Sequence, residues 1–597
     1  MKKAVKYALR ISIIAAAIFA VPTIWFKPWS INHFYARVFI QYAARHPMLL
    51  SQLRILEPLG IGFHSDDLDD VSVDFALRET KWAARQLRIL HSYDRAAMTP
   101  EEKLSYDVLD WYMTDSEQQS RFLFHNYPVN QLYGLQTTLP DFMITTHQIN
   151  EADDAEDYLE RLSRFGTYFD QTIEGLRHRE RNGIVPPKFV LEKSIAQMKS
   201  FSAQPPEKNP LYTHLEEKLT TLDAAERSAL LAQARGEIER TVYPAYQRLV
   251  TESTRLAAVA TTDDGFWKLP DGDAAYQMLL RHHTTTEMTA AEIHELGLTE
   301  VAQIQAEMRS ILEREGLEAG EVGAAMARLG EDARFLYPDT DEGRQSLLSE
   351  YQAYIDDIDS HLASLFDLRP KSGVAVKRMP QFREADSPAA YYDSPPFDSS
   401  KPGVFFVNLR NVKEHPKFGM RTLAYHEAIP GHHFQIAIAQ EQTGVPFFRK
   451  IIPFTAFQEG WALYAERLAA ENGFEEDPFD RLGYLTGQLF RAVRLVVDTG
   501  IHSKRWTRER AIEYMRSNTG MAETDVIAEI ERYIVDPGQA CAYKVGQLKI
   551  LQLRQKAMDR LGSRFDPRPF HRVVIGSGAL PLTVLERLAD EWIASVK

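Results

Sequence analysis

HEAIPGHH, residues 426–433, begins like the zinc-binding motif His-Glu-x-x-His, but Pro430 stands where the second histidine is expected. In that motif the two histidines are four residues apart on one helix face, so both reach the same metal ion. The next histidines here are His432 and His433. On a regular helix His432 points to another face than His426, and His433 lies about 10 Å further along the axis. A regular helix therefore brings neither of them to the metal.

Pro430 and Gly431 give the chain a means to alter this helix. Proline cannot donate a backbone hydrogen bond and clashes with the preceding turn, while glycine relaxes the backbone. We expect a local bulge of about two residues, after which GHHFQ restarts the helix. Such a bulge brings His432 to the place of the missing histidine. His432 is therefore the expected second ligand, and His433 is the alternative.

The remaining groups of a metal site follow in order along the chain. Glu427 comes directly after His426 and has the position of a general base, which takes a proton from the attacking water and does not bind the metal. Catalytic zinc has three protein ligands, and Glu459 in FQEGWALYAE supplies the third. Glu466 shares its helix face and would orient a ligand histidine. Two imidazoles and one carboxylate suit zinc. The alternative is a set of ordinary core or surface histidines.

Composition excludes several classes of function. The chain has 597 residues, of which 44% are hydrophobic and 25% charged, as in a globular protein with a large core. Its net charge of −14 argues against nucleic acid as a partner. The single cysteine, Cys541, excludes an intramolecular disulfide and a cysteine-rich metal site. The absence of a GxSxG segment argues against a serine nucleophile.

Residues 1–30 have the pattern of a secretory signal or a membrane anchor. Basic side chains in the first ten residues precede an uncharged run at 11–26. The basic flank predicts that the body of the protein lies outside the inner membrane, in the periplasm, either released or anchored. No cysteine follows the run, which excludes lipid attachment there. We expect contact with the membrane only through this segment.

The rest of the chain is predicted to be mainly helical. Apolar residues recur three and four positions apart over most of it, and Thr289 with Glu292 forms a capping box that starts a helix. The stretch 370–410 differs, because GVAVKRMP and GVFFVNL are β-like and SPPFDSSKPG between them is a loop. The expected fold is mainly α with a small β-sheet just before the metal motif.

HEAIPGHHFQ combined with FQEGWALYAE resembles the bacterial domain-of-unknown-function family 885, and the resemblance extends over roughly 45–595 through segments such as TAAEIHELGLTEV and GQACAYKVGQLKI. The family is regarded as related to gluzincin-like zinc peptidases such as angiotensin-converting enzyme and the thermostable carboxypeptidases, in which long helices surround a deep channel. The resemblance implies one helical metallopeptidase-like domain at 31–597, with two lobes flanking the channel and the catalytic half at 370–597. It also implies one zinc ion per chain, with these residues around it: His426, His432 and Glu459 as ligands and Glu427 as the base.

The same relatives suggest further catalytic residues. They stabilise the oxyanion of peptide hydrolysis with a tyrosine on a late helix, and Tyr543 has a matching position with Gln539 on its face as a substrate contact. The alternative for Tyr543 is packing within a bundle. His502 is a second candidate donor, which Asp498 four residues earlier could orient. A structural histidine is the alternative for His502.

Candidate substrate contacts complete the expected site. Lys544 could bind a substrate carboxylate, or it could be an ordinary surface lysine. In this enzyme class an edge strand binds the substrate backbone, which makes Val407 and Asn408 candidates unless the strand is purely structural. Tyr391 and Tyr392 could line the channel.

These observations favour a zinc-dependent peptidase that cleaves short peptides outside the cytoplasm. One alternative is a non-catalytic, zinc-containing binding or scaffold protein of the cell envelope, because a distorted helix could hold metal without aiming Glu427. Another is a hydrolase of non-peptide amides or of cell-wall peptide stems, since the same zinc chemistry serves these substrates.

Overall fold

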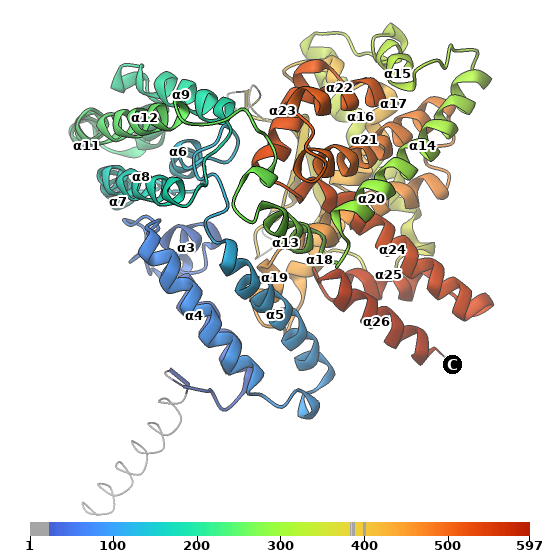
Figure 1. The fold of residues 1–597 in the computed structure, drawn as a ribbon, viewed down its shortest axis with the longest axis horizontal. Coiled ribbons are helices and arrows are strands. Elements are labelled where there is room, and N and C mark those ends of the chain that lie inside the picture. The colour runs from blue at the N-terminus through green and yellow to red at the C-terminus, as the bar shows by residue number, and fades with distance from the viewer. Residues whose placement is uncertain (1–22, 25, 382–383, 385–387, 398–400, 597) are drawn as a thin grey trace, which may run out of the picture. The chain divides into compact units, whose positions relative to one another are not determined.

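The computed structural model of the chain describes residues 23–24, 26–381, 384, 388–397 and 401–596. This part is mainly helical and contains one small β-sheet, as predicted (Figure 1). The expected signal or anchor lies largely at 1–22, outside the described residues. Among the helices that are described, none has the length and apolar character needed to cross a membrane.

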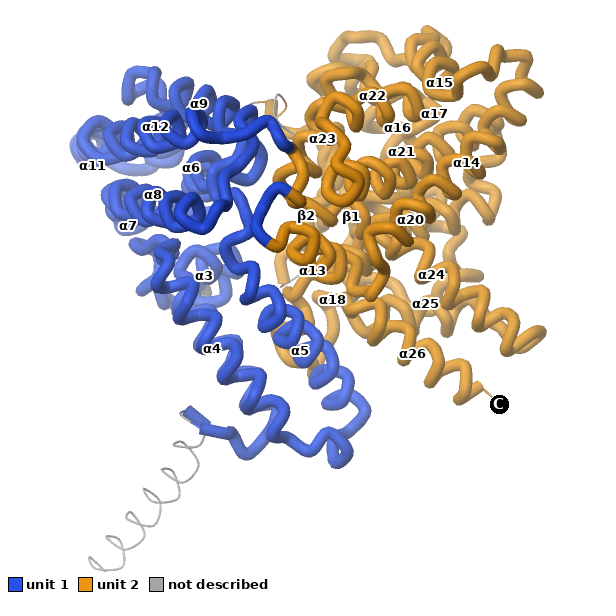
Figure 2. Tube along the Cα trace, in the orientation of Figure 1, with its two compact units in different colours: residues 1–263, 268–270 blue, residues 264–267, 271–597 orange. Residues whose placement is uncertain are grey.

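The chain divides into two compact units, which Figure 2 colours separately. The first unit contains residues 1–263 and 268–270, and the second contains 264–267 and 271–597. The whole HEAIPGHH motif and the segment with Glu459 belong to the second unit.

Helices alone build the first unit, in the part that the structure describes. Its core is formed by apolar side chains of α6 to α12, with Tyr246 packed edge-on against Phe169 at 4.9 Å between ring centres. The helices have these bounds: α2 Ile31–Ala43, α3 Pro47–Leu53, α4 Val73–His91, α5 Pro100–Gln119, α6 Leu135–Thr145, α7 Ala152–Ser163, α8 Phe165–Arg181, α9 Lys188–Ser202, α10 Pro210–Lys218, α11 Ala224–Glu237 and α12 Tyr243–Ala257.

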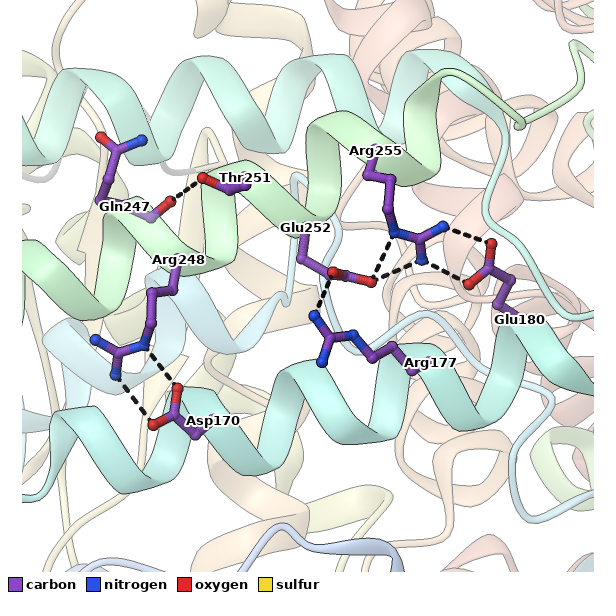
Figure 3. A network of polar contacts seen from close by, with 8 residues as sticks. All are labelled: Asp170, Arg177, Glu180, Gln247, Arg248, Thr251, Glu252 and Arg255. Carbon is purple, nitrogen blue, oxygen red and sulfur yellow. Dashed lines mark hydrogen bonds and ion pairs between the residues drawn. The ribbon is translucent and has the colours of Figure 1, made fainter.

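Ion pairs connect α8 to α12 (Figure 3). Glu252 of α12 is only 4% exposed and accepts hydrogen bonds from Arg177 at 2.9 Å and Arg255 at 2.7 Å. A second pair, Arg248 with Asp170, lies on the solvent side at 2.8 Å. Charged hydrogen bonds strengthen as water is excluded. The buried bonds of Glu252 should therefore stabilise the fold more than the exposed pair of Arg248 and Asp170.

The second unit contains the sheet and the longest helices. Helix α20 packs against α24, and α14 packs against α21. Thr289 and Glu292 form the predicted capping box at the start of α14. The elements have these bounds: α13 Gly272–Thr284, α14 Ala290–Arg314, α15 Val322–Gly330, α16 Asp341–His361, β1 Val374–Arg378, β2 Ala390–Asp393, β3 Gly403–Val407, α17 Lys417–Glu427, α18 His432–Glu441, α19 Phe448–Ile451, α20 Thr455–Glu471, α21 Pro478–His502, α22 Arg508–Thr519, α23 Glu523–Val535, α24 Gln539–Leu561, α25 Pro567–Ile575 and α26 Leu582–Ser595.

The sheet has the strand order β1-β3-β2, which corrects the prediction for GVFFVNL. Strand β3 is the middle strand, parallel to β1 and antiparallel to β2. The carbonyl of Val407 accepts from the Met379 amide at 2.8 Å, and the Asn408 amide donates to the Ala389 carbonyl at 2.8 Å. With both sides occupied, β3 is no edge strand, and Val407 and Asn408 have no backbone groups left for a substrate.

Replacing Glu252 with Gln should lower the free energy of unfolding by about 1–2 kcal/mol at pH 7, since two arginines lose a charged acceptor. Burial raises the pKa of Glu252, but the bonds from Arg177 and Arg255 outweigh this and leave the pKa below its usual value. A carboxylate with a lowered pKa stabilises the fold above its unfolded pKa and loses that contribution as the pH falls through its folded pKa. Urea unfolding should therefore show the difference between wild type and variant shrinking below about pH 4.

Asp170→Asn is the matched control for this prediction. It removes the carboxylate of the exposed pair with Arg248, on the same two helices. The expected loss is below about 0.5 kcal/mol. Equal losses in both variants would contradict the assignment of the stronger contact to Glu252.

Candidate metal centre

The metal motif spans two helices, and the interruption is larger than the predicted bulge. Helix α17 ends at Glu427, and Ala428 leaves the helical region with φ −108° and ψ −100°. The Ile429–Pro430 peptide bond is cis. Helix α18 begins at His432. The two histidines therefore come from the last turn of one helix and the first residue of the next.

Gly431 is required by the close approach of this turn to α17. A Cβ atom at this position would lie 1.9 Å from the carbonyl oxygen of His426 and 2.3 Å from that of Tyr425. The turn is also attached to α20, because the indole Nε1 of Trp461 donates to the Pro430 carbonyl at 2.8 Å. These contacts fix the path of the chain between the two histidines.

His426, His432 and Glu459 lie together, each offering one donor atom within 4.8 Å of the others. Oε2 of Glu459 is 3.4 Å from Nε2 of His432 and 3.7 Å from Nε2 of His426. Two donors that each bind a tetrahedral zinc at about 2.1 Å are roughly 3.4 Å apart. Within the described structure Glu459 Oε2 is buried and makes no hydrogen bond. The three side chains thus fit a zinc ion in spacing and donor type, and one of the donor atoms has no hydrogen-bond partner among the described residues.

His433, the alternative ligand, faces away from this cluster. Its Nδ1 contacts the hydroxyl of Tyr392 at 2.9 Å, and its Nε2 contacts the Ser372 carbonyl at 3.0 Å. Burial lowers the pKa of His433 to about 4. Both nitrogens of His433 are occupied, so of the two candidates only His432 has a nitrogen directed at Glu459. Tyr392, which was a candidate for lining the channel, uses its hydroxyl for this contact with His433.

Glu466 is bonded to the first histidine of the cluster, as the sequence predicted. Its Oε1 lies 2.7 Å from Nδ1 of His426, and both side chains are buried. Burial by itself lowers the pKa of His426, but the carboxylates of Glu459 and Glu466 outweigh it and raise the pKa to about 9. The pKa of Glu459 is lowered, because the positive charges of the histidines exceed the effect of burial. Glu466 holds Nδ1 of His426, which leaves Nε2 directed at Glu459.

Glu427 is buried at the end of α17, next to the cluster. Its charge contributes to the raised pKa of His426 and also acts on Tyr351 of α16. The hydroxyl of Tyr351 contacts Nδ1 of His415 at 3.0 Å, and Nε2 of His415 contacts the Asn408 carbonyl at 2.7 Å. No pattern in the sequence points to Tyr351 or His415, because they meet only in the folded chain.

Tyr543 on α24 lies beside the ligand helix. The charge of Glu459 acts on its hydroxyl, and burial raises the pKa of Tyr543 more than that charge does. The side-chain amide oxygen of Gln539, four residues before Tyr543 on the same helix, accepts from Arg532 at 2.6 Å. The guanidinium of Arg494 lies 4.5 Å from the tyrosine ring. Arg532 therefore occupies the amide oxygen of Gln539, which was a candidate substrate contact. No pattern in the sequence pointed to either arginine, because both lie on other helices than Tyr543.

His502 and Asp498 are bonded to structural partners in the second unit. Nδ1 of His502 accepts from the Phe266 amide at 3.1 Å, and its Nε2 contacts the Tyr533 carbonyl at 2.9 Å. Asp498 accepts from the hydroxyl of Tyr276 and from the backbone of Gly538. The prediction that His502 assists catalysis and that Asp498 orients it is therefore wrong, because backbone groups occupy both nitrogens.

Lys544 and Asn408 are also committed to internal contacts. Nζ of Lys544 is buried and bonds to Gln488, Gln547 and Glu300, each at about 3 Å. The side-chain amide of Asn408 donates to the Glu384 carbonyl at 2.8 Å and its oxygen accepts from the Arg410 amide. Neither side chain is available to bind a substrate, contrary to the prediction.

Sequence comparison agrees with the resemblance seen in the motifs. Residues 57–588 match the family described as "Bacterial protein of unknown function (DUF885)". The chain belongs to this family. No curated protein matches the chain. A solved structure described as a "putative lipoprotein" from Colwellia psychrerythraea is 36% identical to this chain, with a TM-score of 0.88 over 94% of this chain and 98% of that one. A "putative lipoprotein of unknown function" from Shewanella oneidensis shares the fold, with 18% identity and a TM-score of 0.74 over 94% and 99%.

Replacing Gly431 with Ala should lower the free energy of unfolding by about 3 kcal/mol or more, because the new methyl group collides with two backbone carbonyls. Thermal unfolding measures the loss. Gly419→Ala is the matched control, since Gly419 lies on α17 and no atom is within 4 Å of a Cβ there. A helical glycine with free space should gain up to about 1 kcal/mol from this change. Equal stability of the two variants would contradict the close approach at Gly431.

Proposed function

We propose that this DUF885 protein is a zinc-dependent hydrolase of short peptides, with His426, His432 and Glu459 as the metal ligands. The observation that carries the proposal is the meeting of three donor atoms from three helices around a carboxylate oxygen without a hydrogen bond. Leaving such a buried atom unsatisfied costs about 1–3 kcal/mol. A divalent metal that accepts two imidazoles and one carboxylate supplies the missing partner, and zinc is the usual one.

The chemistry follows from the groups around this cluster. When bound, zinc polarises a carbonyl oxygen and lowers the pKa of a water molecule. Glu427, the neighbour of His426 on α17, accepts the proton of the attacking water and returns it to the leaving amine. Tyr543 keeps its proton because its pKa is raised. Its hydroxyl donates a hydrogen bond to the oxygen on which negative charge develops.

Short peptides outside the cytoplasm are the proposed substrates. The size limit rests on the resemblance to peptidases in which long helices enclose a channel. Export is supported by the basic and apolar pattern of residues 1–30 and by the names of both similar structures, which contain the word "lipoprotein". The one cysteine of this sequence, Cys541, is buried in α24, so we assign any membrane attachment to the apolar N-terminal segment.

Two alternatives use the same cluster. A non-catalytic zinc protein of the envelope would bind the metal with Glu427 serving no chemical role. A hydrolase of non-peptide amides or of cell-wall peptide stems would use the same chemistry on another substrate. A panel of short peptides, stem peptides and simple amides separates these possibilities from the peptidase.

The metal assignment predicts different results for two adjacent histidines. The full-length chain, purified in detergent, should contain about one zinc ion per molecule by mass spectrometry. His432→Ala should lose it, because a ligand is removed. His433→Ala is the control: it should keep the zinc while unfolding at a lower temperature, since it removes the contacts with Tyr392 and Ser372. Retention of zinc by His432→Ala would sink the ligand assignment.

The base assignment predicts that binding and hydrolysis separate in Glu427→Gln. This variant keeps the size of the side chain but cannot accept a proton. Its zinc content should equal that of wild type, and kcat for a cleaved peptide should fall about 10²–10⁴-fold. Activity close to that of wild type would exclude Glu427 as the base. A wild type that binds zinc and cleaves nothing in the panel would favour the non-catalytic alternative.

A further inference from the structure

Lys544 is a buried cation close to the metal cluster that the proposed chemistry does not use. It lies on α24, is 4% exposed, and meets three oxygen acceptors. Its Nζ is 2.9 Å from Oε1 of Gln488, 3.0 Å from Oε1 of Gln547 and 3.0 Å from Oε2 of Glu300. An ammonium group has three hydrogens and no acceptor, so the three contacts use it completely. A buried charge must be paired and hydrogen-bonded, and Glu300 with the two glutamines meets this requirement.

The ammonium group determines which way the Gln488 amide faces. An amide turned the other way would bring its NH₂ against the NH₃⁺ of Lys544, donor against donor. With the oxygen held by Lys544, the NH₂ of Gln488 points at Glu466 and donates to Oε2 at 2.9 Å. The other oxygen of Glu466 contacts Nδ1 of His426 at 2.7 Å. The orientation is thus transmitted from Lys544 through Gln488 and Glu466 to His426.

We propose that Lys544 is a positioning residue for the metal ligand His426. By fixing the Gln488 amide it fixes Glu466 as an acceptor for the Nδ1 hydrogen of His426, so that the lone pair of Nε2 faces the metal. Carboxylates that hold a ligand histidine in this way raise metal affinity. The inference rests on the proposed zinc site, and it assigns to Lys544 a role two side chains away from the metal.

Gln547 provides a control within the same structure. Like Gln488 it is buried and accepts from Lys544 through its amide oxygen. Its NH₂, however, donates to the backbone carbonyl of Leu463 at 2.9 Å and not to Glu466. Loss of Gln547 weakens the surroundings of Lys544 without breaking the connection to His426. Methionine has nearly the shape of lysine and glutamine and makes no comparable hydrogen bond, so it is the replacement of choice.

The test measures zinc affinity without any substrate. Full-length wild type, Lys544→Met, Gln488→Met and Gln547→Met are titrated with zinc chloride in competition with a chromophoric chelator. Lys544→Met and Gln488→Met should each bind zinc about tenfold more weakly. Gln547→Met should stay within about twofold of wild type, since it leaves the path to His426 intact. The double variant Lys544→Met/Gln488→Met should bind zinc no more weakly than either single variant. Each change alone already breaks the same connection to Glu466 and His426. Melting temperatures recorded in parallel show how far each variant is destabilised.

Three results would overturn the inference: wild-type zinc affinity in Lys544→Met, equal weakening in Gln547→Met and Gln488→Met, or additive losses in the double variant. These outcomes are separate from those of the proposed function. A chain that shows the expected pattern of zinc affinities and cleaves no peptide loses the proposed hydrolase activity but keeps the role of Lys544. A wild type that binds no zinc overturns both.

Discussion

The close contact between helices α20 and α24 is the constraint on which the candidate centre depends. A Cβ on Gly546 would lie 1.9 Å from the carbonyl oxygen of Ala456, and one on Gly460 would lie 2.5 Å from the Gly546 backbone. The main chains of the two helices therefore touch. A side chain at either glycine would prevent this contact. Glu459 precedes one of these glycines and Tyr543 lies almost one turn before the other. The contact thus sets the distance between the Glu459 carboxylate and the Tyr543 phenol.

Two cations hold glutamine oxygens next to this contact: Lys544 binds Gln488, and Arg532 binds Gln539. In the first pair the cation takes the amide oxygen, and the amide nitrogen is turned to Glu466. A glutamine alone could flip and exchange donor for acceptor, whereas a glutamine beside a buried cation cannot. The orientation of the Gln488 amide beside the cluster is therefore fixed.

The mainly helical fold class and the candidate donors His426, His432 and Glu459 could be predicted from the sequence, because helical spacing and two short motifs indicated them. Apolar spacing indicated helices, and the seven-residue spacing of Glu459 and Glu466 placed both on one face of α20. The roles of His502 and Lys544 could not be predicted. Periodicity says which face of a helix a residue occupies but not which distant element covers that face. The partners of His502 come from Phe266 and Tyr533, and no pattern near His502 refers to them. The position of β3 in the middle of the sheet could not be predicted either, because the sequence of a strand does not show which other strands pair with it.

Three consecutive residues of α20 serve three different parts of the centre. Glu459 offers a carboxylate to the cluster, Gly460 permits the contact with α24, and Trp461 holds the turn that contains Pro430. A search of genomes for His-Glu-x-x-His would miss this arrangement. The turn that contains Pro430 and Gly431 increases the spacing between the two histidines beyond that of the motif. The geometry defines a different search pattern: His-Glu, then Pro-Gly-His, then Glu-Gly-Trp on a later helix. Chains that carry this pattern are where the same cluster should be sought.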